Sequence, residues 1–236
     1  MTDLSQGGGM KTPEARPASH SFGDEMLAGY VAGALPEAFG LVIAAQASLD
    51  PDTRARLDAL EAIGGALLED GSAVAMGDDA LAATLARIAE AENGASPAAE
   101  AGASLRVADC DVLPAPVRAY VGGGLDDVRW RPVGMGAKQA ILHETGEASV
   151  RLLSIPAGCE MPDHGHHGTE MTLVLKGAFI DGDARYARGD VEVVDEDVAH
   201  RPVADIGEDC ICLVACEGRL KFSGLLPRMA QPFLRI

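Results

Sequence analysis

The hydrophobic residues between positions 20 and 93 recur every three to four residues, which is the spacing of amphipathic helices. Four apolar stripes are present: Met26, Leu27, Tyr30 and Val31; Phe39, Val42, Ile43 and Leu49; Leu57, Leu60, Ile63, Leu67 and Leu68; and Leu81, Leu85 and Ile88. The pair Asp50-Pro51 predicts the start of the third helix, because Asp is a favoured N-cap and Pro a favoured first helical residue. Since the connections are short, we expect a compact four-helix bundle.

The spacing of apolar residues changes to that of β-strands after residue 104. Strands are predicted at 149–155, 171–180, 190–195 and 210–217, with turn signals such as Arg188-Gly189-Asp190 between them. Short strands at this regular spacing predict an antiparallel barrel or jelly roll. The expected fold class is therefore a two-domain chain, with an α-helical bundle followed by an all-β domain.

Two segments have the composition of unstructured chain. Residues 1–19 contain three consecutive glycines and two prolines, and residues 94–103 (GASPAAEAGA) resemble a flexible linker. We therefore expect a disordered tail at 1–19, a helical domain at 20–93, a linker at 94–103 and a β domain at 104–236. The linker further predicts that the helical domain can act independently of the β domain.

The charge of the chain is strongly negative and unevenly distributed. The 236 residues carry a formal net charge of −17. Residues 21–92 contain thirteen Asp or Glu against three Arg, a net charge of −10. This balance argues against direct binding of nucleic acid, since phosphate contacts need clustered Lys and Arg. It suits docking to a basic protein, although a solvated acidic surface would look the same.

Five cysteines are present, all from residue 110 onward, at spacings unlike those of a secreted disulfide framework. No leader-like segment and no apolar run of membrane-spanning length is evident. We therefore expect a cytoplasmic protein with reduced thiols and no membrane partner. Cys210, Cys212 and Cys216 share strand parity, which fits either a redox relay or buried cysteines that serve as small apolar residues.

One cluster of residues has the pattern of a metal site. His164 and His166 are two apart, so in a strand both side chains point to the same face, and Glu170 and His200 follow. Three imidazoles and a carboxylate suit a divalent transition metal; we expect zinc, with manganese, iron and nickel as alternatives. The competing interpretation is four separate polar residues in an exposed glycine-rich loop. His167 is an alternative ligand, although its parity points it to the opposite face.

This segment resembles the first cupin motif: His164-x-His166, three residues, Glu170, six residues and Gly177. The stretch from Gly189 to His200 resembles the second motif, without the usual proline and glycine ahead of the histidine. The resemblance implies a cupin β-barrel over 104–236, with the four residues as metal ligands. It does not imply a function, since the fold serves enzymes, storage proteins and sensors.

Residues 20–70, from His-Ser-Phe-Gly-Asp-Glu-Met to Leu-Glu-Ala-Ile-Gly-Gly-Ala-Leu-Leu-Glu-Asp, resemble the anti-sigma domain of ChrR-type regulators. These proteins join that domain to a C-terminal cupin, in the order found here. The resemblance implies an anti-sigma factor that binds and inhibits an extracytoplasmic-function (ECF) sigma factor, in a response to photo-oxidative or other oxidative stress.

The chain departs from that family at one site. The family's helical domain holds zinc with an early His and a later His-x3-Cys-x2-Cys. His20 matches the first ligand, but Gln46, Asp50 and Thr53 stand at the later positions. Because structural zinc sites rely on thiolate and imidazole ligands, we expect no zinc in the helical domain.

The leading functional hypothesis is a transcriptional regulator, with the cupin as sensor of a stress signal or a small-molecule ligand. The alternative is a metal-dependent cupin enzyme, a dioxygenase or hydrolase, with a helical appendage. A third is a cupin that only binds a ligand. The helical domain favours the regulator, since an enzyme has no evident need of it.

Overall fold

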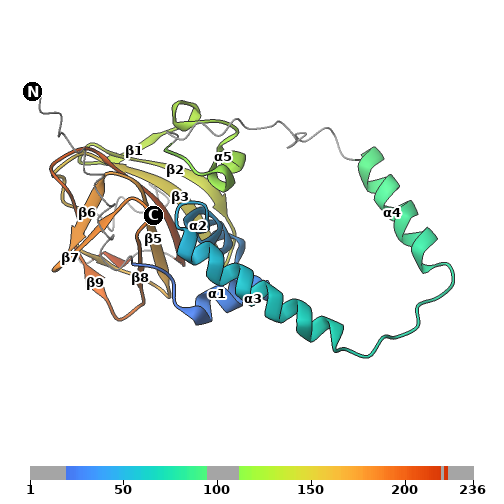
Figure 1. The fold of residues 1–236 in the computed structure, drawn as a ribbon. Helices are drawn as coiled ribbons and strands as arrows, with labels where there is room; N and C mark the ends of the chain where they lie inside the picture. The colour runs from blue at the N-terminus through green and yellow to red at the C-terminus, as the bar shows by residue number, and fades with distance from the viewer. Residues whose placement is uncertain (1–19, 95–111, 219–220, 223–236) are drawn as a thin grey trace, which may run out of the picture.

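Helices precede strands along the chain in the computed structural model, which describes residues 20–94, 112–218 and 221–222 (Figure 1). The helices are α1 (Asp24–Val31), α2 (Glu37–Ala47), α3 (Pro51–Glu69), α4 (Ala80–Gly94) and α5 (Ala115–Val121), followed by the short 3-10 helix η1 (Leu125–Asp127). The predicted tail at 1–19 and the predicted linker beyond Gly94 lie outside the described residues.

The strands that are described form three antiparallel sheets. They are β1 (Arg131–Gly134), β2 (Ala137–Glu144), β3 (Ala148–Ile155), β4 (His164–Gly165), β5 (Glu170–Lys176), β6 (Ala178–Asp181), β7 (Ala184–Ala187), β8 (Val191–Val194), β9 (Ala199–His200), β10 (Val203–Ala204), β11 (Cys210–Glu217) and β12 (Lys221–Phe222). Their orders are β1-β2-β3-β11-β5-β8, β10-β6-β7 and β12-β4-β9. The closed barrel that the sequence predicted is not found among these strands.

The strand predicted at 171–180 is divided in two by Gly177. This residue has a φ of +69° and lies between β5 and β6. A Cβ atom there would lie 2.7 Å from the carbonyl oxygen of Asp209, so glycine is required both for the backbone conformation and for the close approach. The break moves β6 out of the large sheet and into the small one that packs against it.

The six-stranded sheet has an apolar core on each face. Along β11, Cys210, Cys212 and Val214 pack with Phe179 of β6 and Ala204 of β10. The alternate residues of β11 belong instead to the core beneath the helices. The large sheet therefore separates the helices from an interior that the small sheets enclose.

Helix α2 lies against the helix-facing side of this sheet, in contact with β3, β5 and β11 (Figure 1). It is apolar on all sides, and Phe39, Val42 and Ile43 are fully or nearly fully buried, as expected of a helix enclosed by other elements. One hydrophobic cluster runs from Phe22 and these helical residues to Leu152 of β3. The helical and β parts thus share a core, while the boundaries predicted at 93 and 104 stay predictions.

The four-helix bundle is not confirmed. α1, α2 and α3 pack together, but α4 stands apart from them (Figure 1), and every side chain from Leu81 to Glu90 is exposed. The second half of α3 also lacks a partner among the described residues, with Ile63 58%, Leu67 71% and Leu68 83% exposed. The second half of α3 and α4 each carry the predicted apolar stripe, but no other element among the described residues covers it.

Candidate metal centre

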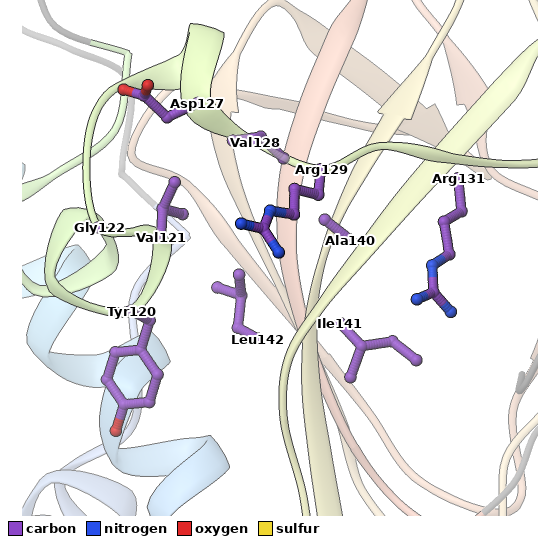
Figure 2. Close-up of a pocket in the computed structure, with 10 residues that line it drawn as sticks. All are labelled: Tyr120, Val121, Gly122, Asp127, Val128, Arg129, Arg131, Ala140, Ile141 and Leu142. Carbon is purple, nitrogen blue, oxygen red and sulfur yellow. The ribbon is translucent and has the colours of Figure 1, made fainter.

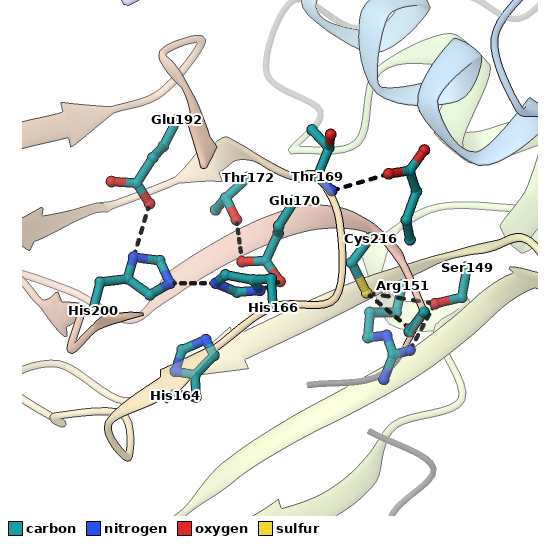
Figure 3. Close-up of polar contacts among 12 residues, drawn as sticks. Ser149, Arg151, His164, His166, Thr169, Glu170, Thr172, Glu192, His200 and Cys216 are labelled. Carbon is teal, nitrogen blue, oxygen red and sulfur yellow. Dashed lines mark hydrogen bonds and ion pairs between the residues drawn. The ribbon is translucent and has the colours of Figure 1, made fainter. Parts of the chain in front are cut away.

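The four predicted ligands come together inside the β part. His164 of β4 pairs directly with His200 of β9, Glu170 begins β5, and His166 follows β4. All four side chains are buried, and their potential ligand atoms lie within 4.8 Å of one another (Figure 3). The pairing of β4 with β9 is what brings together residues that are 36 positions apart in the chain.

The nitrogen atoms of this cluster face one another rather than solvent. His166 Nε2 lies 3.0 Å from His200 Nε2, and His166 Nδ1 lies 3.2 Å from Glu170 Oε2. The three imidazole rings have centroids 4.7 to 5.1 Å apart. Such a concentration of buried lone pairs needs protons or a cation between the rings, since uncompensated polar atoms are costly in an interior.

The protonation states fit metal binding. Burial lowers the pKa of His164, which favours the neutral imidazole that a metal requires. Burial would raise the pKa of Glu170, but the contact with His166 and the nearby imidazoles outweigh it, so the pKa falls and the carboxylate is ionised. The residues therefore fit a divalent transition metal as a donor set.

A second layer of groups holds the histidines. His200 Nδ1 lies 2.7 Å from Asp181 Oδ2 and 3.7 Å from Glu192 Oε2, while His164 Nδ1 lies 2.8 Å from the carbonyl oxygen of Pro162. Burial, followed by the neighbouring Asp181, raises the pKa of Glu192 to about 8. Carboxylates and carbonyls that hold the outer nitrogen of a histidine fix which nitrogen faces the metal.

Sequence reasoning missed Asp181 and Glu192. Nothing in the sequence pattern connects Asp181, or Glu192 within its strand, with His200. Their roles depend on the packing of β6 and β8 around β9. The alternative ligand His167 is exposed, as its parity predicts.

The three cysteines of β11 line the same interior. Cys216 pairs with Glu170 on one side and with Ser149 on the other, and its sulfur lies 3.8 Å from Ser149 Oγ (Figure 3). The sulfurs of Cys210 and Cys212 are 3.4 Å apart. Burial raises the pKa of Cys216, and the hydrogen bond with Cys210 together with burial raises that of Cys212. Their shared parity is confirmed, and the raised pKa values of Cys212 and Cys216 disfavour the thiolate form that redox chemistry needs.

A separate cavity of about 550 Å³ lies between α5 and strands β1 and β2 (Figure 2). Its walls include Arg129, Arg131 and Leu142, and none of the four clustered residues lines it. The hydroxyl of Tyr120, at one end, donates to the carboxylate of Glu37 and so ties α5 to α2.

The positions that match the family's helical zinc site have other contacts. Asp50 is the N-cap of α3, as predicted, and its side chain accepts from the backbone N–H of Thr53. Gln46 is fully buried, and the imidazole of exposed His20 lies against the ring of Tyr186 with centroids 4.4 Å apart.

Comparisons with known proteins agree with a chain of N-terminal helices followed by a cupin-like part. Residues 120–219 match the family described as the ChrR cupin-like domain. The anti-sigma-E factor ChrR of Cereibacter sphaeroides is 46% identical over 217 residues, which cover 92% of this chain and 98% of the relative. The crystal structure of Rhodobacter sphaeroides SigE in complex with the anti-sigma ChrR contains a chain that is 45% identical, with a TM-score of 0.70, covering 84% of this chain and 98% of that one. None of the helices that are described has both the length and the apolarity of a membrane span.

Proposed function

Since the chain belongs to the ChrR family of anti-sigma factors, we propose that it binds and inhibits an ECF sigma factor through its helical segment. The ChrR chain in the crystal structure is bound to SigE, which supports a partner of the same class here. On this proposal the chain acts in the cytoplasm and contacts neither DNA nor a membrane directly.

The exposed apolar faces of α3 and α4 carry the proposal. Ile63, Leu67 and Leu68 on α3 and Leu81 and Leu85 on α4 are each more than half exposed. Exposed apolar surface on two long helices marks a protein-binding surface, because water contact with such side chains is unfavourable. Helix α4 lies away from the other helices, so a partner can reach the apolar face of α3 as well as that of α4 (Figure 1).

The charge of the helical segment supports a basic partner. Residues 21–92 carry a net charge of −10, and acidic side chains flank the apolar positions, such as Glu61 and Glu69 on α3. Sigma factors must present basic surfaces to DNA, so complementary charge should steer the encounter between the two proteins. Because salt screens this attraction, binding should weaken as the salt concentration rises.

We propose further that His164, His166, Glu170 and His200 hold one divalent transition metal, zinc in our expectation, with manganese, iron or nickel as alternatives. A bound ion would neutralise the carboxylate and cross-link β4, β5 and β9. Because these strands enclose the interior of the cupin-like part, a metal or small ligand there is suited to the sensing of a stress signal. The domain boundaries at 20–93 and 104–236 belong to the same proposal.

Binding to an ECF sigma factor of the source organism tests the anti-sigma function. Leu67→Glu combined with Leu85→Glu, in the full chain, should weaken affinity by at least about 100-fold, since two buried anchors are worth about 1.4 kcal/mol or more each. Ile206→Glu is the matched control, because Ile206 is 87% exposed but lies in the β part. Affinity is measured by titration calorimetry at low and moderate salt.

If the unaltered chain does not bind the sigma factor, the anti-sigma proposal is wrong and a cupin enzyme becomes the leading hypothesis. If the double variant and Ile206→Glu bind equally well, the partner surface lies elsewhere on the molecule.

A further inference from the structure

Gln46 joins the helical segment to the β part. Its side-chain amide nitrogen lies 3.2 Å from the carbonyl oxygen of His20 and 3.2 Å from that of Gly189. Two carbonyl acceptors require two N–H donors, so the orientation of the amide is fixed by its partners. One side chain of α2 thereby holds both the segment before α1 and the turn between β7 and β8.

Thr53 and Asp50 hold the other end of this amide. The Thr53 hydroxyl has one hydrogen, which it shares between Asp50 Oδ2 at 2.7 Å and, in the longer branch, Gln46 Oε1 at 3.3 Å. Asp50 Oδ2 also accepts from the Thr53 backbone N–H. All three side chains are buried. The cap of α3, the last turn of α2 and the β7–β8 turn are thus linked by a continuous set of buried hydrogen bonds.

The same segment is joined through the backbone. The Val191 N–H donates to the carbonyl oxygen of His20 at 2.8 Å, so His20 receives one hydrogen bond from α2 and one from β8. Gly189 has a φ of +89°, a conformation that favours glycine and turns its carbonyl toward Gln46. The next residue of β8, Glu192, lies 3.7 Å from His200, so the contact is adjacent to the candidate metal centre.

These positions do not fit zinc. Gln46, Asp50 and Thr53 offer no thiolate and no imidazole, and each already has partners within the protein. The imidazole of His20 lies against Tyr186, and it is the backbone oxygen of His20 that meets Gln46.

We propose that Gln46, Thr53 and Asp50 form a metal-free junction that takes the place of the helical zinc site and couples the helices to the β7–β8 turn. In this chain the order of α2 and α3 then depends on the cupin-like part and not on zinc or on thiol oxidation in the helices. The inference rests on the hydrogen bonds above and does not require the sigma factor.

Hydrogen exchange of the Val191 amide in the full chain, measured by NMR, tests the coupling. Gln46→Met keeps the length of the side chain but removes both donors, and it should speed exchange of this amide about ten-fold, since a lost buried hydrogen bond is worth about 1.4 kcal/mol. Gln139→Met is the control, because it also removes a buried amide, one that contacts Arg151 in the sheet. Gln139→Met should not speed hydrogen exchange of the Val191 amide more than that of other amides in the β part.

Thr53→Val provides a milder variant if Gln46→Met does not fold; it preserves shape and should speed the same amide by a smaller factor. If neither variant changes exchange at Val191 beyond the control, the junction does not couple the two parts and the proposal is wrong.

The absence of zinc is tested in the full chain with the cupin ligands removed. The double variant His166→Ala, His200→Ala, incubated with zinc and desalted, should retain none by elemental analysis. One retained zinc per chain that disappears on the further change His20→Ala would show that a helical zinc site exists, and would overturn the proposal. This outcome leaves the anti-sigma function untouched, since that function is tested by binding to the sigma factor.

Discussion

His200 reaches the candidate metal centre with one ring nitrogen and is held by the other. Its Nδ1 atom lies 2.7 Å from Asp181 Oδ2, which fixes Nδ1 as the protonated nitrogen and leaves Nε2 free to bind a metal. Asp181 lies at the end of β6, so a residue outside the four-residue motif sets the orientation of a ligand inside it.

We predict that Asp181→Asn weakens metal binding about 10- to 100-fold, because the neutral amide holds the imidazole of His200 less strongly than the carboxylate does. His200→Ala should remove binding almost completely. Asp183→Asn is the control, since Asp183 is exposed in the same turn. Competition with a chromophoric chelator gives the affinities; equal values for the two aspartate variants would contradict the role of Asp181.

The cysteines differ in their exposure, and this predicts their reactivity. Cys210, Cys212 and Cys216 are buried, whereas Cys159 is partly exposed. Because thiolates are the reactive form and the pKa values of Cys212 and Cys216 are raised, a maleimide should modify Cys159 in the native protein and the three buried thiols only after unfolding. Mass spectrometry of the labelled peptides checks this. Rapid native labelling of Cys212 would instead support the redox relay.

Helix α3 has two halves with different partners. Leu57, in the first half, is 1% exposed and packs in the core, whereas Leu67, in the second, is 71% exposed. Leu57→Ala should lower the free energy of unfolding by about 2–5 kcal/mol, as expected for a buried leucine. Leu67→Ala should change it by no more than about 0.5 kcal/mol. Urea unfolding of the full chain measures both; similar losses would mean that the second half packs against this chain in solution.

The pattern of apolar residues predicted the elements better than their contacts. The helices, the cap at Asp50 and the strand at 210–217 were predicted and are confirmed. The closed barrel and the four-helix bundle were predicted but are not confirmed. For the bundle the reason is that an apolar stripe shows that a helix face needs a partner, but not whether this chain provides it. The strand predicted at 171–180 missed the break at Gly177, where tertiary packing rather than composition decides.

The candidate metal centre shows the same division. Its four members follow from motif spacing and strand parity, which are properties of the local sequence. Asp181 and Glu192 could not be predicted, because they meet His200 only after three sheets have assembled. The sequence places Gln46 only at a position of the family's zinc site; its contact with Gly189, 143 residues away, is visible only in the fold.

At the scale of the whole molecule, the helical segment and the cupin-like part depend on a common core. Residues of α2 and of β3 belong to a single hydrophobic cluster, and α2 contacts three strands of the large sheet. This arrangement bears on the expectation that the linker allows the helical segment to act alone. A linker permits independence only if each part can bury its own apolar surface.

We therefore predict that residues 20–94, expressed alone, do not fold as they do in the full chain. Phe39, Val42 and Ile43 lie on a helix whose burial is completed by the sheet. Re-exposure costs about 1.5–3 kcal/mol for each fully exposed side chain, and the total stability of a domain is only about 5–15 kcal/mol. The fragment should therefore show reduced helicity by circular dichroism, no cooperative thermal transition, and association as its concentration rises. A monomeric fragment with a sharp transition and the helicity of the full chain would show that α1, α2 and α3 form a self-sufficient unit, and that the sheet only adds to its stability.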